Sequence, residues 1–120
     1  MDITKKEYTI KTDMSKNKVV IVISGFFSEK SVAEFVNDYN ALKKEVNVSN
    51  TDLVIDGSNL KVFAKELEGN LSSLYHDYAN FKKVYIVPST ELVSKMQLKR
   101  ILKSENLEEH FEFIKSVADV

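Results

Sequence analysis

Short apolar strands alternate with amphipathic helical segments along this chain, and this alternation constrains the fold more than any other feature. Residues 18–24 (Lys-Val-Val-Ile-Val-Ile-Ser) are β-branched and almost continuously apolar, which is typical of a strand covered on both faces. Residues 53–56 and 83–87 predict two further buried strands. Apolar residues at three- and four-residue steps predict helices over residues 28–45, 64–78 and 91–103. Ser28 is the predicted N-cap of the first helix, and Ser89 or Thr90 that of the third.

The two ends of the chain predict additional strands. Residues 8–14 alternate weakly between apolar and polar, which predicts a first strand at an edge of the sheet, joined by the polar turn 15–17 as an antiparallel hairpin. Residues 111–114 predict a last strand, and residues 116–120 form at most one helical turn. Alternating strands and helices imply right-handed crossovers and mostly parallel pairing. We therefore expect one α/β domain over residues 1–120, with element order β-β-α-β-α-β-α-β and a four- to five-stranded mixed sheet with helices packed against it.

Composition excludes several classes of function. The net charge of −1 gives no basic excess to attract nucleic acid. The chain has no cysteine, which excludes disulfides, thiolate catalysis and cysteine zinc sites, and His76 and His110 lack metal-ligand spacing, so neither metal nor cofactor is expected. The longest apolar run, residues 19–23, is too short to span a membrane, and the start of the chain has no apolar run like that of a signal peptide. A cytoplasmic location without membrane insertion is the expectation.

The strongest candidate site follows the strand that ends on Asp56. A polar turn, Asp-Gly-Ser-Asn, comes before the next helix, and ligands of open α/β sheets bind at the carboxyl ends of strands. The same residue types are also those that ordinary turns use. We predict that Asp56, Ser58, Asn59, Lys61 and Lys65 contact a partner.

A second candidate is a basic stripe on the third predicted helix. Lys95, Lys99 and Lys103 recur every four residues, with Arg100 beside them. The stripe is suited to an acidic protein or a phosphate-bearing ligand, although such stripes are more often the solvated face of an amphipathic helix.

Aromatic and acid–base candidates are weaker. His76 and Asp77 are adjacent on a predicted helix, so their side chains point about 100° apart and do not form a catalytic pair. Of Phe26 and Phe27, one is expected to pack under the following helix and the other to be exposed.

The chain resembles the STAS domain, the fold of the anti-sigma-factor antagonists, over nearly its whole length. The resemblance lies in residues 19–25, 53–58, 81–88 and 111–116. Residues 75–84 are also similar to the bacterial STAS/SEC14-like group. These are hydrophobic patterns and not catalytic motifs.

The chain departs from the antagonists at the position of their phosphorylated serine. The corresponding stretch is Ala64-Lys65-Glu66-Leu67, which has no hydroxyl group, and Lys65 stands about where the serine would be. Phosphorylation at the usual position is therefore not expected, while Ser58 remains a hydroxyl earlier in the turn.

The resemblance implies a non-enzymatic, regulatory protein–protein interaction module. The alternative is a carrier of a small apolar or lipid-like ligand, as in the SEC14-like group, with a cavity lined by residues such as Phe35, Leu71 and Tyr75. A homodimer formed through the edge strand 8–14 is a further alternative.

Overall fold

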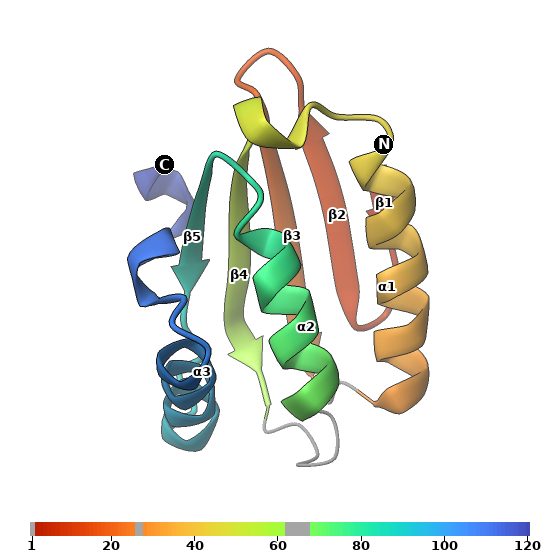
Figure 1. The fold of residues 1–120 in the computed structure, drawn as a ribbon. Coiled ribbons are helices and arrows are strands. Elements are labelled where there is room, and N and C mark those ends of the chain that lie inside the picture. Colours follow the sequence, from red (N-terminus) through yellow and green to blue (C-terminus); the bar gives the residue numbers. More distant parts are fainter. Residues whose placement is uncertain (1, 26–27, 62–67) are drawn as a thin grey trace.

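The computed structural model describes residues 2–25, 28–61 and 68–120. In these ranges the chain forms one mixed sheet and three α-helices (Figure 1). The strands are β1 (Asp2–Thr4), β2 (Tyr8–Asp13), β3 (Lys18–Gly25), β4 (Asp52–Leu60), β5 (Lys83–Val87) and β6 (Phe111–Phe113). The helices are α1 (Glu29–Lys43), α2 (Glu68–Tyr78) and α3 (Leu92–Ser104), with 3-10 turns at Val48–Asn50, Glu108–His110 and Val117–Asp119.

The strands lie side by side in chain order, from β1 at one edge to β6 at the other. β1, β2 and β3 are antiparallel, whereas β3 to β6 are parallel. This confirms the predicted α/β class, the hairpin and the mixed sheet. The predicted number of strands is wrong, because the described sheet has six strands and not four or five. The additional strand, β1, has three residues and no periodic pattern, and only its pairing with β2 makes it a strand. For the same reason β2 is not the edge strand that the sequence predicted.

The core lies on one face of the sheet. Alternate strand residues, such as Val19 and Ile21 of β3, join the buried residues of all three helices in a single cluster. Val20 and Val22 of the same strand point to the opposite face and are only half-buried. The prediction that residues 18–24 are covered on both faces is therefore wrong. Each helix joins two neighbouring parallel strands, and successive crossovers move along the sheet in the same direction. Because such crossovers share one hand, they place the three helices on the same face of the sheet.

A side-chain hydrogen bond caps the start of α1 but not the start of α3. The backbone N–H of Ser31 donates to the Ser28 hydroxyl at 3.2 Å, which confirms the predicted cap of α1. Neither Ser89 nor Thr90 caps α3 as predicted, because the cap position is Glu91. The Ser89 hydroxyl instead donates to the Leu60 carbonyl at 2.7 Å and so ties the end of β5 to the end of β4. The predicted start of the second helix, at residue 64, and Phe26 and Phe27 lie outside the described residues.

No helix within the described ranges is both long enough and apolar enough to cross a membrane.

Candidate functional site

Strand β4 continues through the segment that the sequence predicted to be a turn. β4 extends to Leu60, with Asn59 beside Ser24 and Leu60 beside Gly25 of β3. The register shifts between the Val22 and Ser24 pairs, so β4 accommodates one extra residue as a bulge. The predicted turn is wrong because pairing with the end of β3 gives these residues backbone partners that a local pattern does not reveal.

Asp56 and Ser58 bind each other at this bulge. One carboxylate oxygen of Asp56 accepts hydrogen bonds from the Ser58 backbone N–H at 3.0 Å and from the Ser58 hydroxyl at 2.7 Å. Both residues are half-buried. The pair therefore fixes the backbone conformation, and the atoms it uses are not free to bind a partner.

Asn59 and Lys61 are exposed beside residues from the end of β5. The ammonium of Lys61 lies 3.4 Å from a carboxylate oxygen of Glu91, and the two side chains are 61% and 49% exposed. The backbone N–H of Thr90 donates to the Ser58 carbonyl at 3.3 Å. We call the exposed residues Asn59, Lys61, Thr90 and Glu91 the β4-end surface.

The β4-end surface contains two of the predicted partner-binding residues and two that the sequence reading missed. The pairing of Asp56 with Val87 brings the residues that follow β5 next to the end of β4. In the sequence, the predicted parallel order of the strands was the only indication of this neighbourhood. Lys65, the fifth predicted contact, lies outside the described residues.

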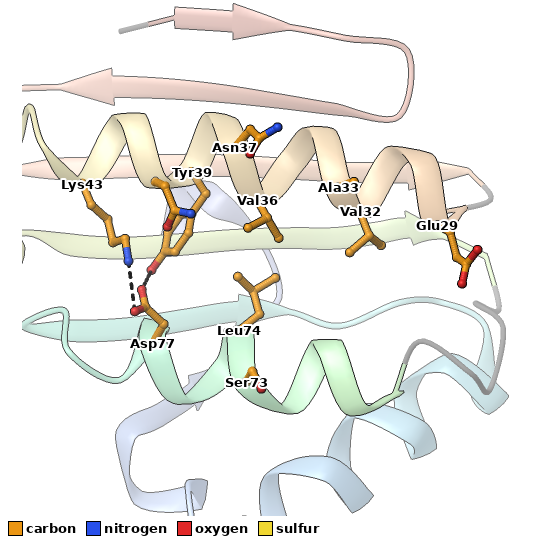
Figure 2. Close-up of a pocket in the computed structure, with 11 residues that line it drawn as sticks. Glu29, Val32, Ala33, Val36, Asn37, Tyr39, Lys43, Ser73, Leu74 and Asp77 are labelled. Carbon is orange, nitrogen blue, oxygen red and sulfur yellow. Dashed lines mark hydrogen bonds and ion pairs between the residues drawn. The ribbon is translucent and has the colours of Figure 1, made fainter.

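A groove of about 670 Å³ lies between α1 and α2 (Figure 2). Val32, Val36 and Leu74 form its apolar part. The remaining lining residues are polar or small: Glu29, Ala33, Asn37, Tyr39, Asn40, Lys43, Ser73 and Asp77. Glu29 and Lys43 stand at opposite ends of α1, so the α1–α2 groove is acidic at one end and carries a paired lysine at the other. The periodicity of the sequence did not indicate this groove, because the groove depends on how α2 lies against α1.

Asp77 holds the two helices together at the lysine end of the groove. Its two carboxylate oxygens accept hydrogen bonds from the Tyr39 hydroxyl at 2.6 Å and from the Lys43 ammonium at 3.0 Å. The ammonium also lies 5.0 Å from the centre of the Tyr39 ring. Burial, together with the hydrogen bond to Asp77, raises the pKa of Tyr39 far above its ordinary value, so this phenol stays protonated as a donor.

Asp77→Ala should lower the free energy of unfolding by about 1–3 kcal/mol, because the buried Tyr39 hydroxyl loses its acceptor. Urea denaturation measures the change. Ser73→Ala, one turn earlier on the same helix and exposed, is the control and should change stability by less than about 0.5 kcal/mol. Equal stability of the two variants would show that the Asp77 contacts contribute nothing.

The residues that the carrier hypothesis places around a cavity lie in the packed core of the described part of the chain. Phe35, Leu71 and Tyr75 are all buried in the core cluster. Among the hollows formed by described residues, the one bordered by Tyr75 has a volume of about 30 Å³, the share that one water molecule takes in the liquid.

The histidines do not converge on a site. His76 is exposed and its ring nitrogen lies 2.8 Å from a carboxylate oxygen of Glu105, while the neighbouring Asp77 points to Tyr39 and Lys43. Over the described ranges, no group of three or more histidine, aspartate or glutamate side chains is arranged to hold a metal ion.

No protein family matches the chain, and no curated protein is significantly similar to it. The STAS resemblance therefore depends on the residue patterns and on the α/β element order.

Proposed function

We propose that this protein is a non-enzymatic, STAS-like, cytoplasmic interaction module that binds another protein through the β4-end surface. One observation carries the proposal. The ends of two adjacent parallel strands present the exposed side chains Asn59, Lys61, Thr90 and Glu91 on backbone held in place by the bulge and by Ser89. The carboxyl ends of strands are where open α/β sheets place their binding residues.

The chemistry at this surface favours binding over catalysis. The Ser58 hydroxyl donates to Asp56, and neither residue lies within the α1–α2 groove. His76 is on α2 and pairs with Glu105, and His110 is in the turn before β6, so neither histidine comes from the strand ends. A nucleophile with an oriented base beside a pocket, as enzymes require, is not assembled among the described residues.

The same geometry argues against a phosphate switch at Ser58. A phosphate on this hydroxyl would be next to the Asp56 carboxylate, 2.7 Å from the present oxygen, and like-charge repulsion would oppose it. We therefore propose constitutive binding and not binding controlled by phosphorylation at this serine.

The test places a photo-crosslinking amino acid at position 59 in one variant and at position 49 in another, in cells that make the protein. Ser49 is also exposed but precedes β4, at the opposite end of that strand. We expect a discrete protein adduct from position 59 and not from position 49. Identical adducts from both positions would contradict the proposal.

A charge exchange then tests the chemistry of the surface. Lys61→Glu combined with Glu91→Lys keeps the internal ion pair but reverses its direction. We expect the adduct yield from position 59 to fall roughly tenfold, the effect of about 1.4 kcal/mol in binding. An unchanged adduct yield would show that binding of the partner does not depend on these two charges.

A further inference from the structure

The outer face of α3 carries exposed apolar residues followed by basic ones. Val93 and Met96 are 56% and 60% exposed, although the other face of the helix is buried through Leu98 and Ile101. Arg100 and Lys103 continue the same line at helical spacing and are also exposed. We call Val93, Met96, Arg100 and Lys103 the α3 stripe.

The composition of the α3 stripe is typical of a protein contact. Methionine and arginine are enriched at interfaces, and Arg100 is the only arginine of the chain. Two neighbouring exposed apolar side chains on a soluble helix indicate a surface that is covered in some state. The aromatic and leucine anchors typical of membrane-surface helices do not occur among these four residues, which favours a protein surface over a lipid one.

The α1–α2 groove has an apolar middle and an acidic end, which complement the apolar and basic halves of the α3 stripe. Val32, Val36 and Leu74 give it an apolar middle, and the exposed Glu29 stands at one end. The small side chains of Ala33 and Ser73, both exposed, leave the entrance open. The α1 wall spans 15 residues and α3 spans 13, so the two are of similar length, roughly 20 Å.

Charge selects one orientation for a helix in this groove. If α3 lies antiparallel to α1, Arg100 and Lys103 approach Glu29 and the two apolar residues face Val36 and Leu74. In the parallel orientation the basic half would meet Lys43, whose ammonium already pairs with Asp77. The charges of that pair cancel, so the basic half gains no net attraction there, whereas Glu29 attracts it in the antiparallel orientation.

We propose that the α1–α2 groove of one molecule binds the α3 stripe of a second copy, antiparallel and head to tail. The two surfaces differ, so the contact is heterologous and leaves a free groove at one end of every open assembly. Association therefore proceeds past the dimer, to an open chain or to a closed ring in which every groove is filled. This contact uses none of the β4-end residues and goes beyond the proposed function.

Sedimentation velocity of the full chain over a range of concentrations, roughly micromolar to millimolar, tests the proposal. We expect the average mass to rise with concentration beyond that of a dimer. Met96→Asp and Glu29→Lys should each weaken association at least tenfold, because the first places a charge in the apolar contact and the second sets lysine against the basic half of the stripe. Circular dichroism and melting temperature verify that both variants fold. Glu112→Lys, the same charge change on exposed β6, should leave association unchanged.

A charge exchange distinguishes this contact from any other self-association. Arg100→Glu combined with Glu29→Arg should restore part of the association that either change alone removes. A wild-type protein that stays monomeric throughout would overturn the proposal, as would a closed dimer or association unaffected by Met96→Asp and Glu29→Lys. A groove filled by a helix of a different protein would appear as a monomer in this experiment and would also overturn it.

Discussion

The protein should unfold steeply between pH 10 and 12, because four core tyrosines must stay protonated for it to remain folded. Burial raises the pKa of Tyr75 to about 12, and burial raises the pKa values of Tyr8, Tyr39 and Tyr78 well above their ordinary value. In the unfolded chain these phenols ionise near pH 10. The stabilisation is therefore complete below pH 10 and is lost as pH rises towards the folded-state pKa values.

The size of the effect follows from proton linkage. Each tyrosine contributes a slope of about 1.4 kcal/mol per pH unit, so four contribute about 5.5 kcal/mol per unit. Over two units this loss is about 11 kcal/mol, comparable to the total stability of a typical domain. The rings also contact one another, since Tyr78 lies 5.3 Å from both Tyr39 and Tyr75 between ring centres, so ionising one opposes ionising the next.

Tyrosinate absorbance and circular dichroism, followed together during a pH titration, measure this transition. The two signals should change at the same pH, since the phenols ionise only when the core opens. Tyr75→Phe removes one of the four titrating groups and should lower the slope by about one quarter. Gradual ionisation near pH 10 with the fold intact would contradict the prediction.

Phe35→Ala should lower the free energy of unfolding by about 3–5 kcal/mol, through lost burial and the cavity left behind. Phe35 is fully buried on α1. Its ring meets Tyr8 of β2 edge-on at 5.2 Å and stacks with Tyr39 at 6.0 Å. The ring therefore links α1 to the sheet, and neighbours anchored on β2 and α1 cannot collapse into the space without moving the helix.

Phe113→Ala is the matched control for this substitution. Phe113 is on the edge strand β6, is 39% exposed, and contacts the Lys99 ammonium 5.7 Å from its ring centre. The same chemical change here should cost about 1 kcal/mol or less. Denaturant midpoints of both variants, with unchanged slopes, give the comparison. Equal losses would mean that Phe35 is not a central contact of the core.

The sequence predicted the inward face of α1 well. The three-to-four spacing around Phe35 and Tyr39 reflects the period of the helix, which is a local property. For residues 18–24 the sequence predicted two covered faces, whereas only alternate residues of this strand are buried. The Ser28 cap was equally readable, since its hydroxyl binds a backbone N–H only three residues away.

The structural setting of the candidate site residues was predicted less well. Asp56, Ser58, Asn59 and Lys61 do lie at the end of a strand, but on a strand that continues past Asp56. Neither the Lys61–Glu91 pair nor the contact between Tyr39 and Asp77 follows from spacing, because the partners are 30 and 38 residues apart.

The sequence by itself determined the α/β class, the order of most elements and the buried side of α1, because hydrophobic period and capping act within a few residues. Only the tertiary structure decided that β1 joins the sheet, that β4 extends through its bulge, and that α1 and α2 enclose a groove. In each case backbone or side-chain groups are satisfied by partners far along the chain. Which distant groups meet is set by the packing of the whole domain and not by any local pattern.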